Sequence, residues 1–236
     1  MIGTFSSSNT ALILIDHQLG TMRLIKNIPL EVVKRNTLAL AKTAKILNIP
    51  VILTSSQEQN VQGALLPELE QILPDAFAAR VRRAGIVNAW NDQHFKRAVE
   101  ATGRRNLIMA GVTTDVCLVY PAISACREGY QVQAVLDASG SPYELSEDMS
   151  RRRMEREGVV LTATNTLMAE LAQDWSRPEG YAEVGLRTPV ISTTKPNLTL
   201  QRSFAIAQPA ELCDGADASR RSTLSLFFTQ FSLFGP

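Results

Sequence analysis

Cys117 occupies the position best suited to covalent chemistry. It ends the segment Gly-Val-Thr-Thr-Asp-Val-Cys at 111–117, which follows an apolar run at 106–111 typical of a buried strand. If Thr114 caps a helix, Cys117 falls in the first turn, where unpaired N–H groups and the helix dipole stabilise a thiolate. The position predicts a nucleophile with a lowered pKa, next to N–H groups able to form an oxyanion hole. The alternative is a buried structural cysteine.

Asp16 is the candidate proton acceptor. It follows the apolar run at 11–15, and a carboxylate there could be a general base, a metal ligand, a phosphoryl acceptor or a helix cap. Its neighbours are His17 and Gln18 rather than a second carboxylate. With only two histidines and three cysteines in the chain, a zinc site is disfavoured and Asp16 becomes the natural acceptor for a thiol proton. We interpret His17 as a capping or packing residue.

Three arginines, Arg80, Arg82 and Arg83, supply cations near the expected third strand, after the apolar stretch at 77–81. Alternation along a strand puts Arg80 and Arg82 on one face, whereas Arg83 faces the other way or begins the loop. A guanidinium at the carboxyl edge of the sheet would hold Asp16 in place and favour the thiolate. We expect two of the three arginines to be solvated surface charges.

Several classes of function are disfavoured. The chain has no GxGxxG after the first apolar run, no phosphate-binding GxxxxGK motif and no GxSxG, so we expect no nucleotide cofactor. Its 24 basic and 23 acidic residues leave a net charge of +1, which offers no field for nucleic acid or a membrane surface. The apolar runs are short and no secretory leader pattern is visible. We expect a soluble, cytoplasmic protein that acts on a small molecule.

The elements that must position these residues alternate regularly. Apolar runs typical of buried strands lie at 11–15, 50–54, 106–111, 131–137 and 159–161, and helical periodicity at 30–47, 92–102, 115–129, 146–157 and 165–175. This alternation predicts an α/β fold with a mainly parallel sheet covered on both faces. Ligands bind at the carboxyl ends of such strands, so Asp16, Thr54 and Cys117 should lie along one edge.

One domain is expected over residues 1–178, followed by a C-terminal extension at 179–236. The extension lacks the alternation of strands and helices and carries four closely spaced phenylalanines, Phe227, Phe228, Phe231 and Phe234. Such a group would be a liability if it were fully exposed. The extension is therefore either an oligomerisation arm that docks on a neighbouring subunit or a partly disordered tail.

Three segments resemble the isochorismatase-like cysteine hydrolases: Leu-Ile-Leu-Ile-Asp-His-Gln at 12–18, Ala-Gly-Ile-Val-Asn-Ala-Trp at 84–90 and Gly-Val-Thr-Thr-Asp-Val-Cys at 111–117. The resemblance implies a three-layer α-β-α sandwich around a six-stranded, mainly parallel sheet. It implies a triad of Asp16 as general base, Arg83 as basic member and Cys117 as nucleophile. It also implies a cis peptide bond between Val112 and Thr113, which turns the Thr113 and Cys117 N–H groups onto one oxyanion.

Two departures from the family pattern narrow the expected activity. The basic position is usually lysine, and arginine does not release its proton, so Arg83 is expected to act electrostatically. The zinc-binding nicotinamidase branch has an aspartate and histidines after the second strand, where this chain reads Ser-Ser-Gln-Glu-Gln at 55–59. We therefore expect no metal and no cofactor. The segment at 84–90 resembles a subgroup with mostly unassigned substrates, whose members often form homo-oligomers.

The combined expectation is a hydrolase that cleaves a small amide or related carbon–nitrogen bond through a thioester on Cys117. Asn88, Trp90, Thr54 and Tyr143 are candidate pocket residues, each equally open to a structural role. Two alternatives stay open. One is an isochorismatase-type vinyl-ether hydrolase, a reaction that some relatives carry out without the cysteine; the other is a degenerate oligomeric scaffold without catalysis.

Overall fold

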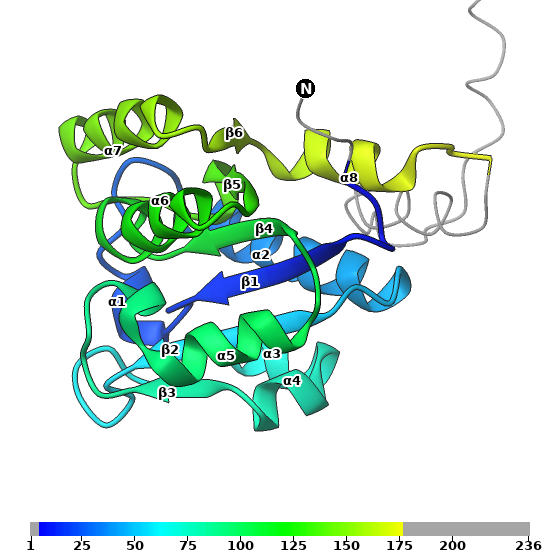
Figure 1. The fold of residues 1–236 in the computed structure, drawn as a ribbon. Helices are drawn as coiled ribbons and strands as arrows, with labels where there is room; N and C mark the ends of the chain where they lie inside the picture. The colour runs from blue at the N-terminus through cyan, green and yellow to red at the C-terminus, as the bar shows by residue number, and fades with distance from the viewer. Residues whose placement is uncertain (1–4, 177–236) are drawn as a thin grey trace, which may run out of the picture. The chain divides into compact units, whose positions relative to one another are not determined.

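The computed structural model describes residues 5–176, which contain one sheet of six strands (Figure 1). The strands are β1 (Thr10–Ile15), β2 (Val51–Ser56), β3 (Val81–Arg83), β4 (Asn106–Gly111), β5 (Gln131–Val135) and β6 (Val160–Thr162). All neighbours pair in parallel, in the order β3-β2-β1-β4-β5-β6. The winding direction reverses between β1 and β4, where open parallel sheets bind their ligands.

Helices connect the strands and cover the sheet. Within the described residues they are α1 (Leu19–Met22), α2 (Leu30–Ile46), α3 (Pro67–Ile72), α4 (Pro74–Ala78), α5 (Gln93–Ala101), α6 (Val119–Arg127), α7 (Glu144–Arg156) and α8 (Thr164–Ala172). Short 3₁₀ turns lie at Ala89–Asn91 and Leu136–Ala138, and a wider turn of the π type at Thr114–Leu118. None of the helices in this part of the chain is long and apolar enough to cross a membrane.

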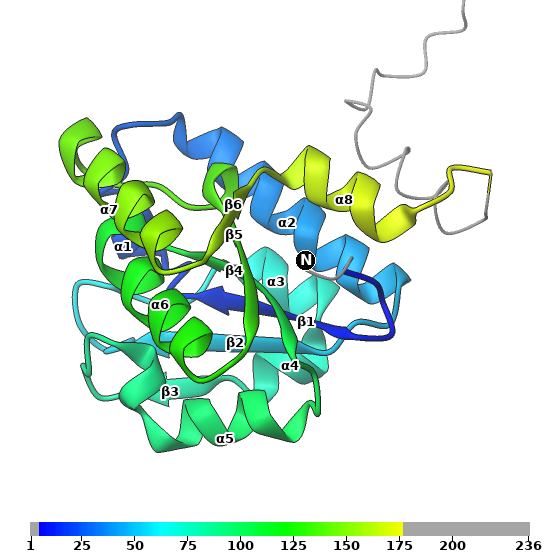
Figure 2. The same ribbon diagram turned by 45° about the horizontal axis from the view of Figure 1, so that its top comes forward.

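Both faces of the sheet are buried, as the continuous apolar strands predict. Leu12 and Leu14 of β1 pack on one face in a cluster that includes residues of α2, α3 and α8. Ala11, Ile13 and Ile15 alternate with them and pack on the other face with residues of α5, α6 and α7. Figure 2 shows α2 and α8 on one side of the sheet and α5 and α6 on the other. The three-layer α-β-α sandwich expected from the sequence is confirmed.

The region between β2 and β3 is more structured than the expected polar loop and short apolar stretch at 77–81. It contains α3 and α4, each of which begins with a proline at its first position, where the missing N–H has no helical partner to lose. These helices span only 6 and 5 residues, too few to show a helical period in the sequence. Phe77 lies in α4, and β3 begins only at Val81.

The helix expected at 115–129 is divided. Residues Thr114–Leu118 form the π-type turn and α6 begins at Val119. Pro121 explains the division: it has no N–H to donate to the Cys117 carbonyl, so a regular α-helix cannot run through Cys117. In the structure Pro121 falls in the first turn of α6, where a proline is tolerated.

The expected domain boundary at residue 178 and the extension at 179–236 lie outside the described residues.

The loop at residues 57–64 is held against α1 by several polar contacts. The Gln18 amide donates to the Ser56 carbonyl at 2.9 Å and accepts from the Ser56 N–H at 2.8 Å. The Gly20 N–H donates to the Gln62 carbonyl at 2.9 Å, and a Cβ on Gly20 would lie 1.8 Å from the Val61 carbonyl oxygen. Only glycine allows this backbone approach.

Replacing Gly20 by Ala should therefore destabilise the protein by about 3 kcal/mol or more, because the methyl group meets backbone that cannot move aside. Urea unfolding measures this change. Gly103→Ala is the matched control, since a Cβ there meets no atom within 4 Å. That variant should lose only about 1 kcal/mol of stability, because alanine is strained in the left-handed backbone conformation of residue 103. In a helix with free space beside it, alanine is more stable than glycine. A Gly20→Ala variant more stable than the parent protein would therefore contradict the close packing of α1 against the loop.

Candidate active site

A cavity of about 390 Å³ lies at the carboxyl edge of the sheet. The residues that line it come from the segments that follow or end β1, β2, β3 and β4. They are Asp16, Gln18, Gly20, Thr21, Leu24, Ser56, Gln57, Val61, Gln62, Arg83, Gly85, Ile86, Val87, Thr113, Val116 and Cys117. Asp16, Arg83 and Cys117, the three residues expected to act together, all line this one cavity.

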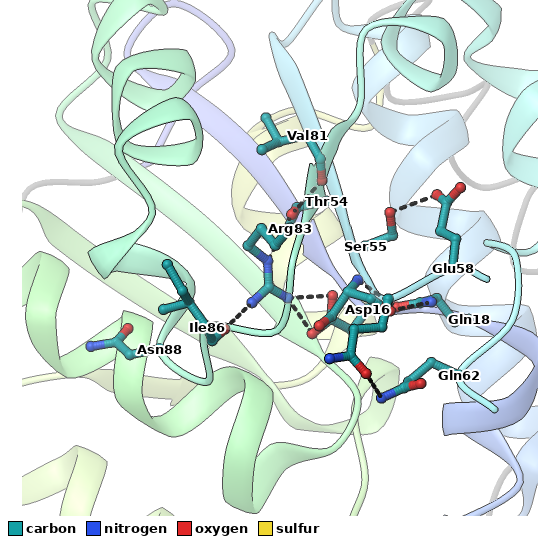
Figure 3. A network of polar contacts seen from close by, with 12 residues as sticks. Asp16, Gln18, Thr54, Ser55, Glu58, Gln62, Val81, Arg83, Ile86 and Asn88 are labelled. Atoms are coloured by element: carbon teal, nitrogen blue, oxygen red, sulfur yellow. Dashed lines mark hydrogen bonds and ion pairs between the residues drawn. The ribbon is translucent and has the colours of Figure 1, made fainter. Parts of the chain in front are cut away.

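Asp16 and Arg83 form a buried ion pair (Figure 3). The Nη2 group of Arg83 donates to Oδ1 of Asp16 at 2.5 Å and also to Oδ2. Its Nε group donates to the Thr54 hydroxyl at 3.0 Å, and its Nη1 group donates to the Ile86 carbonyl at 2.7 Å. The Thr54 hydroxyl in turn donates to the Val81 carbonyl at 2.8 Å. All three guanidinium nitrogens therefore have acceptors on the protein, which fixes the side chain at the floor of the site.

The backbone turns sharply at Asp16, immediately after β1. Asp16 has a φ of 57°, in the left-handed region that aspartate enters more readily than most residues. Its N–H still donates to the Thr54 carbonyl at 2.9 Å, and its own carbonyl accepts from the Gln18 N–H at 2.7 Å. The turn ends the strand and leaves the carboxylate in the cavity instead of on a face of the sheet.

Cys117 lies in the π-type turn after β4, next to Asp16. Its thiol lies close enough to the Asp16 carboxylate for each group to shift the pKa of the other. The Cys117 N–H donates to the Thr113 carbonyl at 2.7 Å, so it is already engaged, unlike the free N–H expected from the sequence. The Val112–Thr113 peptide bond is cis, and the Thr113 backbone lies beside the Cys117 thiol, where it lowers the thiol pKa. Thr113 therefore supplies a backbone donor beside the thiol.

The charge state of the thiol corrects a second expectation. Burial raises the pKa of the Cys117 thiol well above its ordinary value, and the neighbouring Asp16 carboxylate adds to the rise. The hydrogen bond with Thr113 and the Arg83 charge act in the opposite direction but are weaker. Burial also raises the pKa of the Asp16 carboxyl, against the influence of Arg83. The sequence predicted a lowered thiol pKa; desolvation reverses it, and the resting pair is a neutral thiol beside a carboxylate.

Asn88 and Trp90, expected as pocket residues, do not line the cavity. Asn88 accepts from the Trp90 N–H at 3.1 Å and donates to the Ser124 hydroxyl at 3.0 Å, and Figure 3 shows it apart from the ion pair. Trp90 is 3% exposed and packs edge-on against Phe95 and Tyr130. Both residues form the turn that follows β3. The sequence segment alone could indicate either this structural role or ligand binding.

The other candidates also take structural positions. Val112 is fully buried, and Tyr143, the residue before α7, is 71% exposed; neither lines the cavity. Arg80 and Arg82 both pair with Glu58, at 2.7 and 3.3 Å. Of the three clustered arginines, only Arg83 turns inward to the site.

Sequence reasoning missed a further group of residues that lines the cavity. It comes from the loop after β2, with Val61 and Gln62, from Leu24 beyond α1, and from Val87 beyond β3. The available signal was Val61, the one large aliphatic residue in the polar stretch 55–63. The sequence around Val61 does not reveal that α1 holds this loop at the cavity that contains Asp16 and Cys117.

His17 is a packing residue, as interpreted from the sequence. Its ring is fully buried, and Nε2 donates to the Ala138 carbonyl at 2.9 Å. Burial lowers the pKa of His17 from 6.5 to about 4. The ring is therefore neutral in the folded protein near pH 7. Within residues 5–176, no three His, Cys, Asp or Glu side chains lie together as a group that could hold a metal ion.

Comparison with known proteins places this geometry among related folds. Residues 10–166 match the model of the isochorismatase domain family. A curated relative, the probable hydrolase YcaC of Escherichia coli K12, is 40% identical over 176 residues, which cover 74% of this chain and 84% of the relative.

Two solved structures are also similar. YcaC from Pseudomonas aeruginosa, solved with hexane-2,5-diol and covalent acrylamide, has a TM-score of 0.76 and 37% identity, covering 80% of this chain and 94% of its own. The YcaC gene product of Escherichia coli, described as an octameric hydrolase of unknown specificity, has a TM-score of 0.73 and 39% identity, covering 78% and 88%.

The buried His17 should make stability depend on pH. The unfolded chain binds a proton on this ring near pH 6.5, whereas the folded protein does so only near pH 4. Stability is therefore complete above pH 6.5 and falls by up to about 3 kcal/mol as the pH approaches 4. His17→Gln, which keeps a donor for the Ala138 carbonyl, should flatten this part of the profile in urea unfolding. His94→Gln, at an exposed position, should not; equal slopes in both variants would contradict the assignment.

Asp16→Asn should lower the pKa of Cys117, because it removes the negative charge that opposes thiolate formation and leaves the Arg83 charge unmatched. The measurement is the rate of Cys117 alkylation by iodoacetamide across pH, with folding checked by circular dichroism. We expect the midpoint to fall by at least about one pH unit. Asp148→Asn is the matched control, since that aspartate pairs with Arg152 on the surface of α7. An unchanged or raised midpoint in Asp16→Asn would refute the coupling.

Proposed function

The chain belongs to the isochorismatase family, and from this membership and the geometry of its cavity we propose that it is a cysteine-dependent hydrolase of small amides or related carbon–nitrogen bonds. The observation that carries the proposal is the Cys117 thiol beside the Asp16 carboxylate in one cavity, with Arg83 holding the carboxylate. A nucleophile in contact with a base, which a third group orients in turn, is the arrangement that covalent catalysis requires. Arg83 is that third group.

The first step forms a bond between the Cys117 sulfur and the carbonyl carbon of the substrate. Asp16 takes the thiol proton as the bond forms, and the pair of electrons from the carbonyl double bond moves onto oxygen. A neutral thiol with a raised pKa suits this mechanism, because the proton leaves only when the attack begins. The raised pKa of Asp16 brings it closer to the operating range of a general base.

The Thr113 N–H, beside the Cys117 thiol, is the proposed donor to the oxyanion that develops on the substrate. Collapse of the tetrahedral intermediate breaks the carbon–nitrogen bond, and Asp16 returns its proton to the leaving ammonia or amine. Water then attacks the thioester, with Asp16 accepting a proton from it. The acid product leaves and Cys117 recovers its proton.

Arg83 acts in this proposal as a fixed charge. Arginine keeps its proton under all these conditions, and its three nitrogens are occupied by Asp16, Thr54 and Ile86. It holds the carboxylate at one orientation and limits how far burial raises the Asp16 pKa. A lysine could not make the same set of contacts, because its single ammonium lacks the planar fork.

The relatives support the proposal at a coarser level. The similar proteins carry the description of hydrolases, one of them of unknown specificity, and the Pseudomonas aeruginosa protein was solved with acrylamide, a small primary amide, bound covalently. The Escherichia coli protein is octameric, and we propose that this chain also forms a homo-oligomer. The substrate of the reaction is a small molecule, given the size of the cavity.

Cys117→Ala should reduce turnover at least about 10³-fold, because it removes the atom that bonds to the substrate. The assay measures ammonia release from a panel of small primary amides. Cys126→Ala is the matched control, a free cysteine on α6 away from the cavity, and it should retain full activity.

The same pair of variants separates the alternatives. Amide turnover that survives in Cys117→Ala would overturn the nucleophilic role. Hydrolysis of a chorismate-derived vinyl ether by both the parent protein and Cys117→Ala would favour the vinyl-ether hydrolase instead. A folded parent protein that releases nothing from either class of substrate would favour a scaffold without catalysis.

A further inference from the structure

The charges that line the cavity cancel. Among its lining residues in the described part of the chain, Asp16 and Arg83 are the charged ones, and they are bound to each other. The remaining polar groups of the lining are amides, hydroxyls and the thiol, with no net charge. Because the three nitrogens of Arg83 already have acceptors on the protein, no unmatched cation faces a substrate.

A negatively charged substrate would be disfavoured in such a cavity. Its charge would lose water and gain no cation in return, and it would lie near the Asp16 carboxylate. Sites that accept carboxylates or phosphates normally provide an arginine, a lysine or a helix N-terminus for them. Here the arginine that the sequence placed at the site is used to hold the general base.

The mouth of the cavity is apolar. Val61 is 90% exposed and Val87 is 58% exposed, and Leu24, Ile86 and Val116 beside them are also large exposed aliphatic residues. These side chains come from separate segments: the loop after β2, the turn after β3, the end of α1 and the turn after β4. Isolated exposed aliphatic residues are ordinary on a protein surface, but five around one opening form a patch that favours an apolar group.

From these two observations we propose that the cavity selects uncharged amides with an apolar substituent, and that Val61 and Val87 at its mouth determine this specificity. The inference rests on the proposed function and names its substrate class. The reacting carboxamide lies against Cys117 and Thr113, and the substituent lies against the aliphatic residues of the mouth. An amide that carries a carboxylate in that direction meets Val61 and Val87 where a cation would be needed.

The test compares two alkylating reagents of similar size, neutral iodoacetamide and anionic iodoacetate, on the full-length protein. Peptide mass spectrometry follows Cys117, and each rate is divided by the rate of the same reagent with glutathione. We expect the normalised rate at Cys117 to be at least about tenfold higher for iodoacetamide, because like charges in a poorly solvated site repel. This measurement requires access to the cavity but no turnover.

Val61→Lys or Val87→Lys adds the missing cation at an exposed position that should tolerate it. Either variant should reduce the preference for iodoacetamide at least about threefold. Two controls accompany them: Val61→Gln adds polarity without charge, and Tyr143→Lys adds the same charge at an exposed site outside the cavity. Neither control should change the preference.

A turnover assay extends the test to the reaction. It compares butyramide, which ends in a methyl group, with succinamate, which has a carboxylate in the same position. We expect the parent protein to prefer butyramide and Val61→Lys to reduce that preference. Equal normalised alkylation by both reagents, or a preference that neither lysine variant changes, would overturn the inference. Loss of the proposed function has a different signature: no amide is hydrolysed, while Cys117 still discriminates between the two reagents.

Discussion

The buried ion pair between Asp16 and Arg83 is the interaction on which the site depends. Taking two charges out of water is costly unless each is fully hydrogen-bonded, and here the order of strands meets that requirement. Asp16 follows β1 and Arg83 ends β3, with β2 between them. Thr54 of β2 accepts from Arg83 and the Ile86 carbonyl takes another N–H, so three neighbouring strands are tied together at the edge where the cavity opens.

The pairing also sets the charge available for chemistry. The Arg83 charge favours the Cys117 thiolate only weakly, and burial together with the Asp16 carboxylate outweighs it and raises the thiol pKa. The arrangement is that of a nucleophile activated by a general base when substrate arrives, rather than that of a preformed thiolate. The same commitment leaves the cavity electrically balanced, which links the proposed mechanism to the proposed choice of uncharged substrates.

Most of the fold could be predicted from the pattern of residues. The apolar runs at β1 and β4 are long enough to be buried on both faces, and their alternation with helical segments allowed few topologies. The prediction failed where elements are short or where one residue alters a helix. The helices α3 and α4 are too brief to show a period, and Pro121 divided the helix that carries Cys117.

By itself, the sequence determined which reactive groups the site contains and that they lie at one edge of a sheet, since Asp16 and the Cys117 segment each follow a buried parallel strand. Only the tertiary structure decided that Asn88 and Trp90 do not line the cavity and that the loop with Val61 and Gln62 does. It also decided the protonation of the thiol. The reason is physical: the pKa of a buried group depends on desolvation and on charges brought close from distant parts of the chain, and no local pattern records either.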